Sequence, residues 1–100
     1  MARFHVYEHQ GGEGFLLDVQ ANLLEHLNTR VVVPLWPPGK PQPRPARQLN
    51  PVFLIGGQPC TMLTQFMAAV PLTALGKEVA NLQAEQDAVI GALDCVFSGV

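Results

Sequence analysis

Apolar and polar residues alternate over most of the first three quarters of the chain, as they do in β-strands that bury one face. The stretch 29–35 contains three consecutive valines, and β-branched residues favour strands. Gly56-Gly57 separates two apolar runs, and glycine tolerates the positive φ of a tight hairpin turn. Short strands divided by glycine and proline breaks indicate a small barrel or sandwich. The pattern predicts strands over 3–9, 15–20, 29–35 and 68–75, and a hairpin over 52–63.

From residue 82 onward the apolar residues recur at helical spacing. Asn81 is the expected N-cap, and Gly99 is the expected C-terminal breaker. A polar line through Asp94 and Ser98 lies away from the apolar stripe. We therefore predict one amphipathic helix over 82–97 that closes a mostly β chain. Its predicted buried stripe comprises Leu82, Val89, Ile90, Leu93, Val96 and Phe97.

The segment 36–51 is rich in proline. Proline lacks an N–H group and fixes its own φ, so this segment is predicted to be neither a helix nor a central strand. Two interpretations remain, a ligand for a proline-binding groove and a surface loop stiffened by its prolines. The surface loop is the favoured interpretation.

Composition favours one folded domain over residues 1–100, because 48% of the residues are hydrophobic and 14% are charged. So few charges suggest that a partner or a second copy covers part of the apolar surface. No apolar run is long enough to span a bilayer, and the first residues do not resemble a signal peptide, so we expect a cytoplasmic protein without membrane contact. Cys60 and Cys95 are accordingly expected to be reduced and buried.

The charge distribution argues against direct nucleic-acid recognition. The formal net charge is −2, and no lysine or arginine follows Lys77. The only basic cluster, Lys40, Arg44 and Arg47, lies in the proline-rich segment. Because tight nucleic-acid binding requires clustered cations, we expect the partner to be a protein.

Sequence motifs for catalysis are not found. His5, His9 and His26 lack the spacing of a metal site, and there is no nucleophile elbow, phosphate-binding glycine loop or C-x-x-C pair. We therefore expect no metal, no cofactor and no enzymatic activity.

Several strings in a fixed order resemble the CcdB family of toxins. They are LLDVQ (16–20), NTRVVVPL (28–35), PVFLIGG (51–57), MAAVPLTALGKEVANL (67–82) and a helix ending in Gly99-Val100. The resemblance covers almost the whole chain. It implies an SH3-like antiparallel barrel with a single C-terminal helix and a symmetric homodimer. It also implies a function: such toxins bind the A subunit of DNA gyrase, trap the enzyme on cleaved DNA, and are neutralised by CcdA-type antitoxins.

The resemblance also implies which residues contact gyrase. The family typically ends in an aromatic residue, a glycine and an aliphatic residue, and Gly99 and Val100 match the last two. Ser98 stands where the aromatic residue is expected. The other implied contacts are Asp94 on the helix, the aliphatic pair Leu23 and Leu24, and Phe4 and Tyr7 on the first strand.

Two further functions stay open. A homologue that binds antitoxin without poisoning gyrase is one, because serine lacks the contact area of an aromatic anchor. A ribonuclease toxin of the Kid/MazF type is the other, and it requires a basic groove with acid–base residues. The loops near 8–14 and 39–48 depart most from the family pattern, so we expect them to discriminate between antitoxins.

Overall fold

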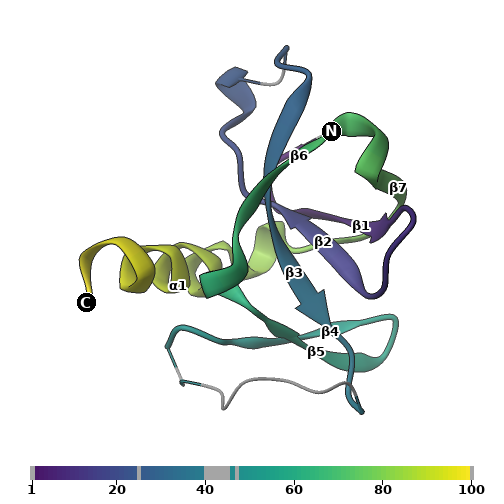
Figure 1. Cartoon of the computed structure of the whole chain (residues 1–100). Helices are drawn as coiled ribbons and strands as arrows, with labels where there is room; N and C mark the ends of the chain where they lie inside the picture. Colours follow the sequence, from purple (N-terminus) through teal and green to yellow (C-terminus); the bar gives the residue numbers. More distant parts are fainter. Residues whose placement is uncertain (1, 25, 40–45, 47, 100) are drawn as a thin grey trace.

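In the computed structural model, an antiparallel sheet curls into a half-barrel that carries one helix at its C-terminal end (Figure 1). The structure describes residues 2–24, 26–39, 46 and 48–99. The strands are β1 (His5–His9), β2 (Phe15–Asp18), β3 (Thr29–Trp36), β4 (Val52–Ile55), β5 (Gln58–Met62), β6 (Ala68–Pro71) and β7 (Leu75–Asn81). The helical elements are the 3-10 turns η1 (Asn22–Leu24), η2 (Thr64–Phe66), η3 (Leu72–Ala74) and η4 (Gln83–Glu85), and the helix α1 (Gln86–Ser98).

The long strand β3 organises the sheet, whose order is β4-β5-β3-β2-β1-β7. One half of β3 pairs with β6 from Thr29↔Pro71 onward, and its end pairs with β5 through Leu35↔Met62. Two strands thus share β3 along its length, and the sheet curls between them. This architecture confirms the predicted SH3-like barrel with a single C-terminal helix.

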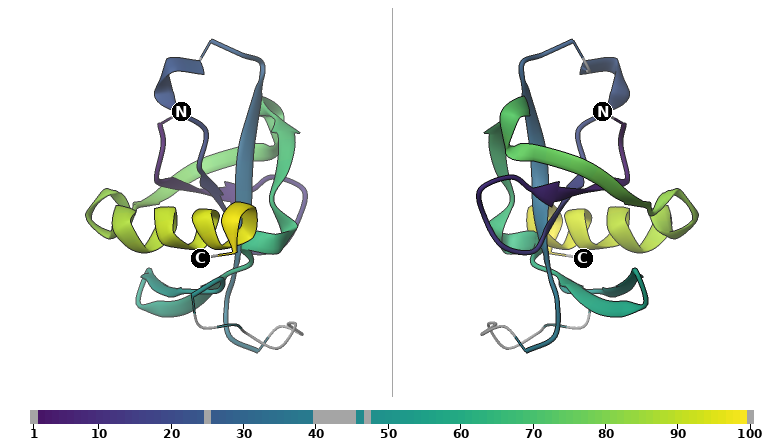
Figure 2. Two further views of the ribbon diagram at one scale, coloured as in Figure 1. Left: turned by 90° about the vertical axis from the view of Figure 1, so that its left-hand side faces the viewer. Right: turned by 90° about the vertical axis from the view of Figure 1, so that its right-hand side faces the viewer.

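The two faces of the sheet pack into separate clusters. Val6 and Tyr7 are neighbours on β1, and alternation sends them to opposite faces. On the first face, Val6 packs with residues that include Val89 and Ala92 of α1. On the second face, Tyr7 packs with Leu16, Val32 and Leu75. Figure 2 shows α1 lying between β7 and the β4–β5 hairpin, so the helix closes the larger cluster.

Strand β7 (Leu75–Asn81) is not predicted by the sequence pattern. The predicted strand 68–75 is β6 (Ala68–Pro71) followed by the 3-10 turn η3 (Leu72–Ala74), and β7 begins where that prediction ended. Its exposed residues do not alternate with buried ones, and its pairing with β1 is irregular on both sides of Tyr7. An edge strand with bulges shows little period-two signal, and therefore the pattern missed it.

The helix begins with a different geometry from the one predicted. Gln83–Glu85 form the 3-10 turn η4, and α1 starts at Gln86. The Oδ1 atom of Asn81 accepts a 2.8 Å hydrogen bond from the Gln83 N–H at the start of η4, and the N-cap of α1 is Glu85 and not Asn81. Gly99 adopts φ 70°, and its N–H donates to the Cys95 carbonyl at 3.0 Å. The predicted glycine stop is therefore confirmed.

Only part of the proline-rich segment is described. Strand β3 continues through Trp36, and residues 40–45 and 47 lie outside the described residues, so the prediction is not tested there. After the proline-rich segment, Asn50 holds the chain against the barrel, because its Nδ2 donates to the Met62 carbonyl at 2.9 Å. The Thr64 hydroxyl donates to the Leu49 carbonyl close by.

Both cysteines are free. Cys60 is buried as predicted, and burial raises the pKa of its thiol. Cys95 is half-buried and not fully buried. Within the described residues, no helix combines the length and the apolar character needed to cross a membrane.

Candidate functional site

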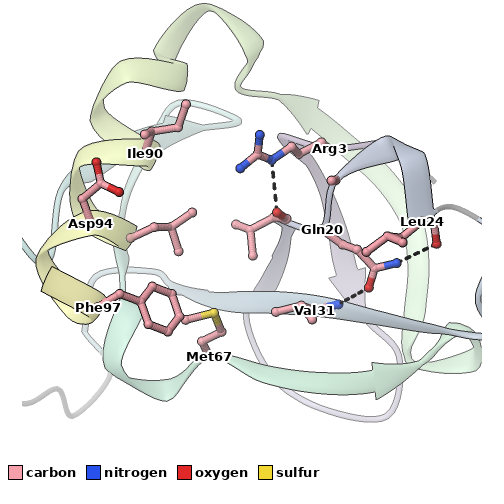
Figure 3. A pocket seen from close by; sticks show the side chains of 11 residues that line it. Arg3, Gln20, Leu24, Val31, Met67, Ile90, Asp94 and Phe97 are labelled. Carbon is pink, nitrogen blue, oxygen red and sulfur yellow. Dashed lines mark hydrogen bonds between the residues drawn. The ribbon is translucent and has the colours of Figure 1, made fainter.

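An open, mostly apolar hollow of about 400 Å³ lies between the C-terminal half of α1 and the turn η1 (Figure 3). We call it the α1–η1 groove. It is lined by Arg3, Val19, Gln20, Ala21, Leu24, Val31, Met67, Ile90, Leu93, Asp94 and Phe97.

The helix supplies one wall of this groove through residues three and four positions apart. Ile90, Leu93, Asp94 and Phe97 follow the spacing that places side chains on one side of a helix. Leu93 packs against the core, whereas Phe97 is 74% exposed and its ring points toward Met67 (Figure 3).

The predicted burial of Val96 and Phe97 is wrong, because both side chains are exposed. The last turns of α1 project beyond the sheet in Figure 1, so no strand covers them. A helical spacing identifies which residues share a face, but only the extent of the sheet decides how much of that face is covered.

The opposite wall is held in place by Gln20. Its Nε2 donates to the Leu24 carbonyl at 2.9 Å, and its Oε1 accepts from the Val31 N–H at 3.1 Å. Gln20 is buried, and its amide ties η1 to β3 through two partly buried hydrogen bonds. The side chain therefore positions Leu24 at the groove, and Leu24 itself is 42% exposed.

Arg3 lies across the groove from Asp94 (Figure 3). Its Nε donates to the Val19 carbonyl at 3.1 Å, and its guanidinium carbon lies 4.8 Å from the centroid of the Phe4 ring. The groove thus has apolar walls with a cation on one side and a carboxylate on the other.

The structure brings together some of the residues implied by the family resemblance. Leu24 and Asp94 line the groove, and Ser98 and Gly99 are exposed at the end of the same helix. The backbone of Leu23 belongs to η1. Its side chain and the whole of Val100 lie outside the described residues.

Phe4 and Tyr7 do not line the groove. Phe4 belongs to the first-face cluster and Tyr7 to the second-face cluster, and each is buried. Their side chains offer a partner almost no surface in this conformation. Phe4 also adopts φ 72°, an uncommon conformation for a residue with a bulky side chain.

Ionisable groups gather on the second face of the sheet. Arg30 and Asp18 are fully buried, with Nη2 and Nε of the guanidinium 2.7 and 2.8 Å from the Asp18 Oδ2. Burial raises the pKa of Asp18, against the opposing effect of Arg30. Burial also raises the pKa of Tyr7, whose hydroxyl oxygen accepts from the Ala2 N–H at 3.1 Å.

The surface edge of this face carries a histidine–carboxylate pair. His5 Nδ1 lies 2.9 Å from Glu78 Oε1, and both side chains are partly exposed. Such a pair is a candidate acid–base group, because a carboxylate orients and supports an imidazole.

A family model described as "CcdB protein" matches residues 3–99. The chain belongs to the CcdB family. This confirms the resemblance found in the sequence. Membership of the CcdB family relates the chain to the toxins of toxin–antitoxin pairs.

Solved structures share the fold of this CcdB family member at low sequence identity. One is an endoribonuclease from a mycobacterial species in complex with its cognate antitoxin, with a TM-score of 0.73 and 17% identity. The similarity covers 97% of this chain and 94% of that one. A second is an endoribonuclease from a mycobacterial species, again with a TM-score of 0.73 and 17% identity, covering 97% of this chain and 90% of the other.

These structures overturn the expectation that the chain is not an enzyme, because proteins with this fold are named endoribonucleases. The expectation rested on missing sequence motifs. A motif search does not detect groups that converge from distant segments, and His5 on β1 and Glu78 on β7 are two such neighbours. At 17% identity the similarity establishes the fold and not the reaction.

Of the residues that line the groove, the sequence predicted only Leu24 and Asp94 as contacts, and those it missed include Phe97, Gln20 and Arg3. Phe97 was assigned to the core, and Gln20 and Arg3 were not selected. Phe97 follows Asp94 by three positions, which places it between the apolar stripe and the polar line. This intermediate position is the sequence signal that could have assigned Phe97 to the groove. The bridging role of Gln20 had none, because it depends on how η1 meets β3.

Proposed function

We propose that this protein is the toxin of a type II toxin–antitoxin pair, which binds the gyrase A subunit and traps the gyrase–DNA cleavage complex. One observation carries the proposal. Leu24 from η1 and Asp94 from α1, two of the gyrase contacts that the family resemblance implies, line one open groove, although they are far apart in the sequence. Ser98 and Gly99 extend the same surface to the end of the helix.

The chemistry of this surface suits a protein partner. Exposed aromatic side chains in an apolar hollow are typical anchors of protein interfaces. Ser98 lacks the aromatic ring expected at its position, and the exposed ring of Phe97 beside it offers aromatic contact area. We propose that Phe97 inserts into gyrase while Asp94 accepts hydrogen bonds at the rim.

Family membership also supports a proposal for assembly and regulation. We propose a homodimer in which the α1 ends of two copies present a joint surface to the two gyrase A subunits. A CcdA-type antitoxin neutralises it by folding a disordered segment onto the toxin. We also propose a cytoplasmic location, because the proposed target is gyrase.

The test is a cleavage assay with purified protein, gyrase and supercoiled plasmid. Linear DNA that appears only when gyrase is present supports poisoning. Asp94→Asn should reduce trapping, whereas Asp87→Asn, at an exposed acid of the same helix outside the groove, should not. Equal activity of the two variants would remove Asp94 from the site.

An endoribonuclease is the second candidate, favoured by the fold shared with the mycobacterial endoribonucleases. His5 and Glu78, with 2.9 Å between Nδ1 and Oε1, are the acid–base pair we assign to it. RNA degradation without gyrase, abolished by His5→Gln, would support this function. If neither DNA nor RNA is cut while antitoxin still binds tightly, the protein is an antitoxin-binding homologue that does not poison gyrase.

A further inference from the structure

Strand β4 forms one edge of the sheet, and its pairing register determines which backbone groups face outward. Ile55 and Gln58 flank the two-residue turn, and Met62 N–H donates to the Pro51 carbonyl at 2.9 Å. Hydrogen-bonded pairs alternate along an antiparallel ladder, so Phe53 also bonds to β5. The N–H and C=O groups of Val52 and Leu54 therefore point away from β5, toward the free edge.

The side chains along this edge are apolar and unprotected. Val52 is 57% exposed and Leu54 is 71% exposed. In the described part of the chain, β4 has β5 as its single strand neighbour. Edge strands are usually guarded by lysine, proline or a bulge, because unpaired backbone groups attract another chain. None of these devices occurs within Val52–Ile55.

A hollow of about 340 Å³ runs along the same edge. It touches Val52, Phe53 and Leu54 in succession, although successive strand residues point to opposite faces. A hollow that contacts all three must follow the strand edge and not one face of the sheet.

The far side of this hollow is closed by the junction of β7 and η4. Asn81, Leu82, Ala84 and Glu85 form that side, and Figure 2 shows the β4–β5 hairpin running beside the start of the helix. A channel bounded in this way admits one extended segment. It excludes the edge strand of a second folded copy, which would bring its own sheet into the space of η4.

The charged residues around the hollow indicate which kind of segment it binds. Glu85 is the one charged residue among those that line the hollow. The nearby first turn of α1 adds Asp87, and the sequence contains no lysine or arginine after Lys77. A segment with basic residues is therefore favoured over an acidic one.

We propose that the β4 edge binds an extended, basic polypeptide segment, which adds a strand to the sheet through the backbone groups of Val52 and Leu54. Apolar residues of the segment alternate against Val52 and Leu54, and its cations face Glu85. The inference rests on the proposed toxin–antitoxin function only for the source of such a segment, a disordered arm of the antitoxin. This surface is separate from the α1–η1 groove, since the two share no lining residue.

The test uses a synthetic hexapeptide of alternating arginine and valine, followed by amide hydrogen exchange of the full chain in NMR spectra. With free peptide at ten times its Kd, exchange at Val52 and Leu54 should slow by about tenfold, because only the unbound fraction exchanges. Phe53 and Ile55 already bond to β5 and should change little. The same peptide with N-methyl groups on alternate residues cannot pair and should give no protection.

Two further comparisons make the outcome decisive. A glutamate–valine hexapeptide should bind at least about tenfold more weakly, a difference of about 1.4 kcal/mol. Leu54→Lys should abolish protection, whereas Leu27→Lys, at an exposed leucine elsewhere, should not. Equal binding of the methylated or acidic peptide overturns the proposal. So does concentration-dependent protection without peptide, which would identify a second copy as the occupant. Neither gyrase nor antitoxin enters this test, so its failure leaves the proposed toxin function untouched.

Discussion

The buried ion pair between Asp18 and Arg30 gives the most quantitative prediction for this fold. Both side chains are fully buried, and Asp18 Oδ2 receives both the Nε and the Nη2 of Arg30 within 2.8 Å. The other oxygen, Oδ1, accepts from the Gln20 N–H at 3.0 Å. Asp18→Asn preserves shape and keeps an acceptor for Gln20, but it removes the charge and turns a donor Nδ2 toward the two guanidinium donors of Arg30.

The expected cost is large because Arg30 keeps its charge. Removing one partner of a buried pair leaves an uncompensated ion and typically costs about 3–5 kcal/mol. The Nη1 atom of Arg30 already has no hydrogen-bond partner among the described residues, so no other group there compensates. For a domain of this size each kcal/mol lowers the Tm by about 4–8 °C, so Asp18→Asn should lower it by at least about 12 °C.

Urea unfolding, followed by the fluorescence of Trp36, the only tryptophan, measures the loss in the free energy of unfolding. The double variant Asp18→Asn with Arg30→Met should recover most of the lost stability, because neither buried charge remains. A loss below about 1 kcal/mol for Asp18→Asn would refute the reasoning, since that is the range of an exposed pair. So would a double variant no more stable than the single one.

Three further predictions concern the end of α1. Phe97→Ala should change the free energy of unfolding by no more than about 0.5 kcal/mol, because the ring is exposed. It should nevertheless weaken gyrase trapping by about thirtyfold if the ring is an interface anchor. Phe66→Ala, at another exposed ring outside the groove, is the control, and equal effects in the cleavage assay would contradict the assignment. Ser98→Trp should increase trapping, and no change or a loss would count against this surface. Gly99→Ala should lower the free energy of unfolding by about 1 kcal/mol, because alanine is strained in the left-handed conformation of this residue. A Cβ there meets no atom within 4 Å, so no steric clash adds to this cost. An unchanged Tm would show that this glycine is not needed to end the helix.

The local pattern of apolar, glycine and proline residues was sufficient to predict most of the strands and the helix. The valines of β3, the Gly56-Gly57 turn and the helical period after residue 82 each determine a backbone conformation through side-chain branching, φ freedom or spacing. These signals are local, so they survive without knowledge of the neighbours. The ordered set of strings indicated the family, which in turn implied the barrel and suggested Leu24 and Asp94 as partner contacts.

Tertiary structure decided the features that depend on distant neighbours. Strand β7 exists because β1 offers it an edge, and Phe97 is exposed because the sheet ends before the helix does. Gln20 positions Leu24 only once η1 lies against β3, and the outward backbone of Val52 and Leu54 is set by the register with β5. Burial and pairing are properties of two segments at once, and a sequence pattern describes only one of them.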